Sequence, residues 1–91
     1  MTILQRHVTV GTAVVEIAGH DNMPHDVHVH NNNTDNAHVL FLGDENVTTS
    51  NGLHVDGKQS VKLTLQPEDR LYAVSNHSAT VAGVLDIRKS D

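Results

Sequence analysis

The stretch VLFLGDENVTTSNG (residues 39–52) decides how this chain folds. An apolar run stops at Gly43, a polar connection follows, and the dipeptide Asn51-Gly52 leads into another extended run. Asn-Gly between apolar runs is a strong turn signal in β proteins. The stretch therefore predicts strand, loop, turn and strand. It contains neither a nucleophile–base pair nor a phosphate-binding loop.

Alternating patterns on both sides of this stretch predict further strands. Val27 and Val29 alternate with His28 and His30, and the apolar residues from 61 to 65 alternate with polar ones. Successive side chains of a strand point to opposite faces, so each alternation predicts one buried face. We expect strands over residues 6–18 (one long strand or a bent pair), 27–31, 39–42, 53–55, 61–65, 71–75 and 80–87.

Turn signals separate these predicted strands, and no segment has a helical pattern. Asp56-Gly57 predicts a hairpin, and Pro67-Glu68-Asp69 predicts a turn. Tyr72 opens a strand after that turn, and we expect its ring to cap the core. About seven or eight strands at regular spacing predict an all-β fold, either a small antiparallel β-sandwich or a jelly-roll-like barrel.

Length and composition limit the classes of function. The 91 residues predict one β domain over residues 1–91, with residues 1–5 as a candidate N-terminal arm and 88–91 as a loose C-terminal tail. A net charge of −5 without a basic cluster argues against nucleic-acid binding. No signal-peptide pattern and no apolar run of roughly 20 residues occurs, so no membrane association is expected. The absence of cysteine excludes disulfides and thiolate metal sites.

Eight histidines raise the question of a metal site. His28 and His30 stand about 7 Å apart on one face of a strand, so a third histidine would complete a site. His77, His54 or His38 is the candidate third ligand. This His-x-His arrangement is similar to that of cupin-type metal proteins, but no glutamate follows it at the cupin spacing. The other reading is that the histidines are exposed polar residues, which would make association sensitive to pH. We expect no metal and no cofactor.

Other polar residues do not form a catalytic set, and we expect no enzyme activity. Ser75 and His77 are close in sequence but lie in a predicted turn, without the Gly-x-Ser-x-Gly elbow. Asp44 and Glu45 lie in an oxygen-rich loop that suits a weakly bound cation, although a solvated loop is the better interpretation. No catalytic residue is therefore assigned.

The order of these turns and strands resembles a known class of protein. An apolar strand ends in Leu42-Gly43, the run VTTSNG and a polar turn follow, and Pro67-x-Asp69 precedes the run LYAVS (residues 71–75). Over residues 27–87 this resembles small β-sandwich structural proteins of tailed bacteriophages, above all capsid decoration proteins.

The resemblance implies a specific role and place. It implies a homotrimer that binds the major capsid protein lattice and stabilises the capsid from the outside of the virion, after synthesis in the bacterial cytoplasm. Ile3 and Leu4, in the candidate arm, are the expected capsid or subunit contacts. The alternatives are a head-tail completion or tail protein, and a small cupin-like metal-binding protein with His28, His30 and His77 as ligands.

Overall fold

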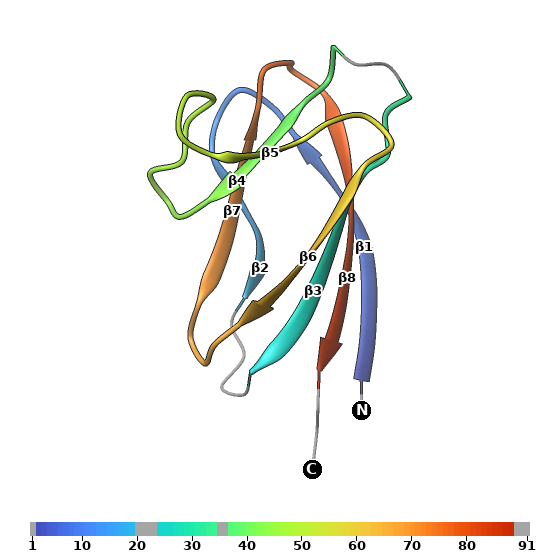
Figure 1. Cartoon of the computed structure of the whole chain (residues 1–91), viewed down its shortest axis with the longest axis vertical. Coiled ribbons are helices and arrows are strands. Elements are labelled where there is room, and N and C mark those ends of the chain that lie inside the picture. Colours follow the sequence, from blue (N-terminus) through green and yellow to red (C-terminus); the bar gives the residue numbers. More distant parts are fainter. Residues whose placement is uncertain (1, 20–23, 35–36, 89–91) are drawn as a thin grey trace.

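The structure is a computed structural model that describes residues 2–19, 24–34 and 37–88 (Figure 1). Its elements are all strands: β1 (Thr2–Val10), β2 (Val15–Gly19), β3 (His25–Asn31), β4 (Leu40–Gly43), β5 (Leu53–Val55), β6 (Ser60–Leu65), β7 (Arg70–Ser75) and β8 (Thr80–Arg88). The predicted all-β fold is thereby confirmed. None of the described residues forms a helix long and apolar enough to cross a membrane.

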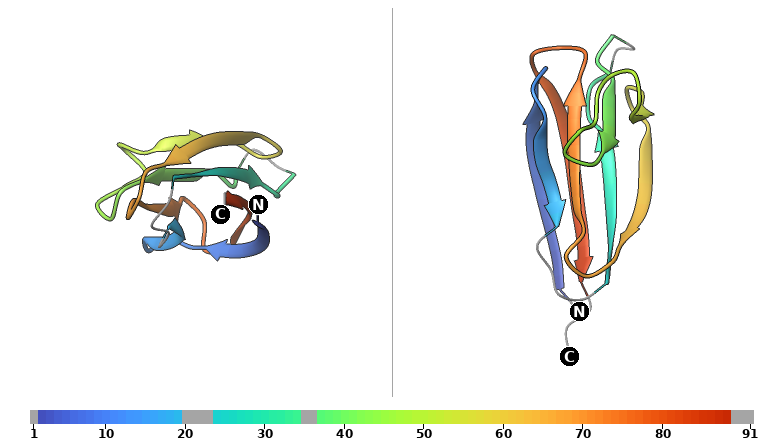
Figure 2. Two further views of the ribbon diagram at one scale, coloured as in Figure 1. Left: turned by 90° about the horizontal axis from the view of Figure 1, so that it is seen from below. Right: turned by 90° about the vertical axis from the view of Figure 1, so that its left-hand side faces the viewer.

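The strands form two four-stranded antiparallel sheets that face each other (Figures 1 and 2). Sheet A has the order β1-β8-β3-β6, and sheet B has the order β2-β7-β4-β5. β4 and β5 are neighbours in both sequence and sheet, whereas every other connection crosses to the opposite sheet. This is the strand order of a jelly-roll sandwich.

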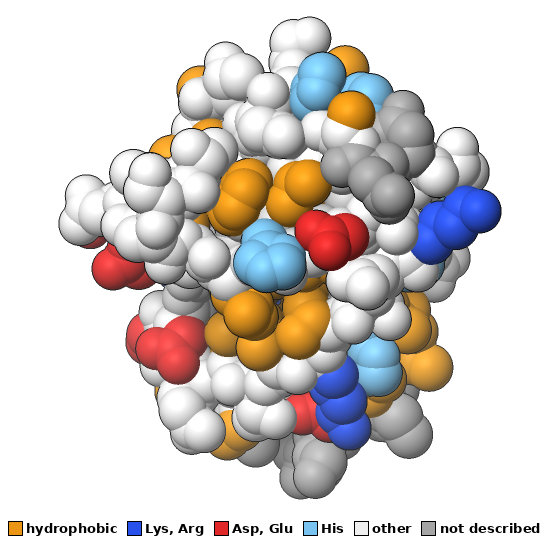
Figure 3. Space-filling model, turned by 45° about the horizontal axis from the view of Figure 1, so that its top comes forward, with side chains coloured by type: hydrophobic (Ala, Val, Ile, Leu, Met, Phe, Trp, Pro, Cys, Tyr) orange, Lys and Arg blue, Asp and Glu red, His pale blue; other side chains and the backbone are white. Residues whose placement is uncertain are grey.

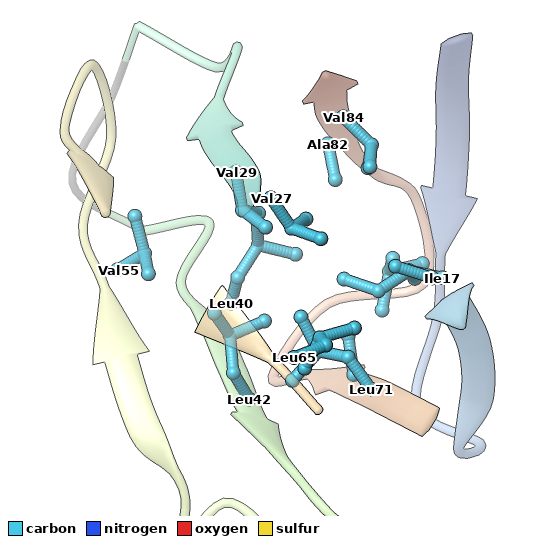
Figure 4. Packing of buried hydrophobic residues seen from close by; sticks show 13 residues of the cluster. Ile17, Val27, Val29, Leu40, Leu42, Val55, Leu65, Leu71, Ala82 and Val84 are labelled. Carbon is cyan, nitrogen blue, oxygen red and sulfur yellow. The ribbon is translucent and has the colours of Figure 1, made fainter. Parts of the chain in front are cut away.

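The core between the sheets is aliphatic, because the alternation of each strand directs small branched side chains inward. In Figure 4, Val27 and Val29 of β3 lie opposite Leu40 and Leu42 of β4. Phe41 lies between two inward residues and therefore faces outward from sheet B, where it is half-buried. Among the described residues, the hydrophobic core thus contains no Phe, Tyr or Trp, in keeping with a chain that has one Phe and one Tyr.

Two expectations about local structure are wrong. Asp56-Gly57 does not close a hairpin, because β5 lies in sheet B and β6 in sheet A. The turn there instead carries the chain across the sandwich, with Gln59 N donating to Asp56 O at 3.0 Å. Tyr72 does not cap the core, because Leu71 and Ala73 point inward and Tyr72 lies half-buried on the outer face of sheet B.

The two ends of the described chain lie side by side in sheet A. Residues 2–5, expected in a separate arm, are the beginning of β1, and they pair with β8 from Thr2↔Arg88 to Gln5↔Leu85. Arg88, expected in a loose tail, is the last residue of β8. Residues 1 and 89–91 lie outside the described part of the chain.

Candidate functional site

The outer face of sheet A carries three histidines from two strands. On β3, His25, Val27, Val29 and Asn31 are buried, so His28 and His30 face outward, as predicted. On β1, Val8 packs against the core and Val10 is buried, so His7 also faces outward. β8 runs between these two strands. The sheet therefore brings His7 to the same face as His28 and His30, a combination that sequence spacing did not reveal.

Gly83 on β8 leaves a hollow between these histidines. His7 and His30 are both register partners of Gly83, one on each neighbouring strand. The Asn32 side chain lies above it, since a Cβ placed on Gly83 would be 3.1 Å from Asn32 Oδ1. The hollow has a volume of about 650 Å³ and is lined by Gln5, Arg6, His7, His28, His30, Asn32, Ser60, Gly83, Val84 and Leu85.

The predicted metal ligands are not brought together. His77 lies in the connection between β7 and β8, where its ring stacks on His38 with centroids 4.3 Å apart and planes inclined by 28°. His54 instead contacts Asp56, with Nδ1 3.2 Å from Oδ1. Among the residues that the structure describes, no three His, Asp or Glu side chains are placed to hold one metal ion. On the face in Figure 3, one histidine lies between hydrophobic side chains at the centre, and two others lie near the upper edge.

Ser75 has a structural environment rather than a catalytic one. Its side chain is buried, and its hydroxyl lies 2.9 Å from Val39 O and 2.6 Å from Thr80 Oγ1. The backbone N–H of His77, not its imidazole, donates to Ser75 Oγ at 3.1 Å. The hydroxyl therefore joins β7 to the residue that precedes β4 and to β8, and it does not form a nucleophile–base pair.

A buried ion cluster joins the two sheets near the start of β1 and the end of β8. The Asp86 side chain is 0% exposed, and its Oδ2 lies 3.0 Å from Arg6 Nη1 and 3.5 Å from Arg88 Nη2. Arg6 also donates to Ile17 O, and Arg88 donates to Gly19 O at 3.2 Å. Both carbonyls belong to β2 of sheet B. The cluster therefore links strands of sheet A to the edge of sheet B.

The four edge strands differ in how accessible they are for pairing. β1 and β6 form the edges of sheet A, and β2 and β5 form those of sheet B. β5 has three residues, and β2 has five with a register shift between Glu16 and Ala18. β6 has six residues and includes Lys62. β1 has nine residues, TILQRHVTV, without Pro, Gly or Lys, and its Ile3 side chain is 56% exposed.

Comparisons with known proteins give one fold-level match. No protein-family model matches the chain, and no curated protein matches its sequence. A solved structure of Bacillus endospore appendages, described as a novel family of disulfide-linked pili, matches with a TM-score of 0.53 and 15% identity. The match covers 98% of this chain and 90% of that chain. At this identity the likeness concerns the fold.

This match overturns the expected relationship to bacteriophage proteins. The fold resembles that of a subunit of a spore-appendage pilus and not that of a capsid decoration protein. The virion location and the cementing role rested on that resemblance and are wrong with it. The capsid lattice is left without support as a partner. The resemblance was based on turn residues and inward aliphatic residues. Such residues occur in many unrelated β-sandwiches, so they do not identify a family.

Proposed function

We propose that this chain is a non-enzymatic structural subunit that associates with copies of itself through the free edge of β1. The fold supports this proposal, because the matching solved structure is that of a protein that forms pili. The buried environment of Ser75 and the separation of the histidines also favour a structural role. The single observation that carries the proposal is the nine-residue edge of β1, the longest of the four edge strands, which pairs with β8 without a register shift.

An edge strand presents a row of backbone N–H and C=O groups that can pair with another chain. Proteins prevent this pairing with short edge strands, bulges, proline or lysine. In this molecule β5 is short, β2 carries the register shift and β6 carries Lys62. β1 is long and regular and has no proline or lysine, and its Arg6 side chain binds inward to Asp86. Exposed Ile3, together with Ile87 opposite it on β8, adds apolar surface beside this edge.

Association of this chain does not use disulfides, because the sequence contains no cysteine. The matching pili are described as disulfide-linked, so this chain departs from them in the bonds that hold copies together. Pairing of β1 with β1 of a second copy would close at a dimer. Pairing of β1 with a different edge of the next copy would continue as an open series.

Sedimentation velocity over a range of protein concentrations tests the proposal. We expect assemblies larger than the monomer to increase with concentration. In the double variant Gln5→Lys/Thr9→Lys, two exposed β1 side chains become charged, and the apparent Kd should rise at least about tenfold, roughly 1.4 kcal/mol. Both positions are exposed, so the fold should be retained.

The matched control is Thr49→Lys/Ser50→Lys, which makes the same change in charge on the exposed β4–β5 connection. It should leave the apparent Kd unchanged. A protein that stays monomeric at every concentration would contradict the proposal. So would an equal effect of the two double variants, because the effect would then come from net charge and not from the β1 edge.

A further inference from the structure

We propose that the hollow around Gly83 binds an oxyanion, a phosphate or a group of carboxylates, when its histidines are protonated. The chain as a whole has a net charge of −5. The described residues that line this hollow nevertheless include no Asp or Glu, while three of them are histidines. On an acidic protein, an anion meets less repulsion at such a site than beside the carboxylates, and protonated histidines attract it.

The hollow exists because β8 has no side chain at position 83. His7 on β1 and His30 on β3 flank this position on its two sides. Asn32 lies over it, and Ser60 is the register partner of His30 on the next strand. Imidazolium, amide and hydroxyl groups from three strands or their ends thus lie around one empty position on β8. These are the donor groups that bind phosphate and carboxylate oxygens.

The spacing of the histidines favours an oxyanion over a metal ion. Strands in a sheet lie about 4.8 Å apart, so the backbones of His7 and His30 are separated by roughly 10 Å, and those of His28 and His30 by roughly 7 Å. A zinc ion requires every ring nitrogen within about 2.1 Å of one point. The described residues contain no such group of three. An oxyanion accepts hydrogen bonds of about 2.7–2.9 Å through separate oxygens, which tolerates wider spacing.

Protonation creates the charge of the site. Imidazole becomes charged between about pH 8 and pH 5, and both of its nitrogens then donate hydrogen bonds. Among the described residues, the other ionisable groups on this face are Lys62, opposite His28, and Asp26, which pairs with Lys62 at 3.8 Å and accepts from Thr64 at 2.8 Å. Arg6 binds inward to Asp86. Acidification therefore adds positive charge around Gly83 with little opposing negative charge.

Asn32 would change its role in this step. Its Nδ2 lies 3.3 Å from His7 Nε2, a contact in which a neutral His7 accepts from the amide. Once Nε2 carries a proton it becomes a donor, so the Asn32 NH₂ can no longer donate to it. The amide then turns its oxygen to His7 or releases it, and its NH₂ group becomes available to the anion.

The test is a titration with inorganic phosphate, followed through the imidazole NMR signals at pH 5.5 and pH 8.0, with NaCl of equal ionic strength as the reference. At pH 5.5 we expect saturable shifts of His7, His28 and His30. His54 and His77, which lie outside the hollow, should not shift. The shifts should disappear at pH 8.0. Citrate, titrated in the same way, distinguishes carboxylate from phosphate preference, and saturable binding of either at the three histidines supports the site.

The double variant His28→Gln/His30→Gln should weaken binding at least tenfold, whereas His54→Gln should not change it. Equal shifts of all five histidines, or binding that persists at pH 8.0, would overturn the proposal. Stoichiometric Zn²⁺ binding at pH 8.0 without anion binding at pH 5.5 would replace it with a metal site. The proposal does not depend on self-association, and sedimentation of the same samples separates the two.

Discussion

Replacement of Asp86 by alanine is expected to lower the free energy of unfolding by about 3–5 kcal/mol. Asp86 is fully buried and holds Arg6 and Arg88, which in turn bind the carbonyls of Ile17 and Gly19. Removing the carboxylate leaves two guanidinium groups facing each other beside the core without a counter-charge. Urea unfolding, followed by circular dichroism, measures the loss as a lower midpoint at an unchanged slope.

Two further variants separate the buried cluster from general loss of charge. Glu45→Ala removes one negative charge from an exposed loop position and should change stability by no more than about 0.5 kcal/mol. Asp86→Asn keeps the shape of the side chain without its charge and should fall between the two. If Asp86→Ala costs less than about 1 kcal/mol, the cluster does not hold the two sheets together.

Replacement of Gly19 by alanine is expected to cost about 2–4 kcal/mol. Gly19 has a φ of +138°, which side-chain-bearing residues rarely adopt. An added Cβ would also lie 2.8 Å from Asp69 O and 2.9 Å from Arg70 Cα, both of them backbone atoms that a side-chain rotation does not move. Thermal unfolding should show the loss as a clear decrease in Tm.

Lys58→Gly provides the opposite backbone change. Lys58 has a φ of 66°, a left-handed conformation that glycine adopts without steric cost. The relief of strain and the added freedom of the unfolded chain nearly cancel, so stability should stay within about 1 kcal/mol of the parent. A Gly19→Ala protein as stable as Lys58→Gly would show that the backbone at β2 relaxes without penalty.

The sequence was sufficient to predict which residues share a face of a strand. Val27 and Val29 point to the core, and His28 and His30 point outward, because the two-residue period leaves no other arrangement once one face is apolar. Residues 53–55 and the turn at Pro67 were also predicted correctly. These features depend on local chemistry, which the sequence contains in full.

Features that depend on sheet assignment were not predictable in this way. Asp56-Gly57 makes a turn in either case, but local residues do not determine whether the next strand returns to the same sheet. For the same reason the sequence did not reveal that His7 and His30 lie on the same face of one sheet, on the two strands that flank β8. Nor did it reveal the contact of Arg6 with Asp86, which lies 80 residues later in the chain.

The candidate sites were predicted less well than the fold, because they depend on which strands become neighbours in a sheet. His77 looked like a third metal ligand because only its distance in sequence was visible, and the structure places it against His38. Tyr72 was expected to cap the core because it opens a strand after a turn, yet its neighbours Leu71 and Ala73 fill the inward positions. Ser75 is a further example. Its place beside His77 in the sequence raised the question of catalysis, but its hydroxyl is buried and binds neighbouring segments.

Hydrogen exchange of the β1 amides, at low and at high protein concentration, tests the proposed self-association most directly. If copies pair through this edge, the β1 amides that do not bond to β8 should exchange at least about tenfold more slowly at high concentration. Amides of the exposed connection between β4 and β5 should not change and serve as the internal reference. Assemblies that form while the β1 amides exchange at an unaltered rate would contradict the account.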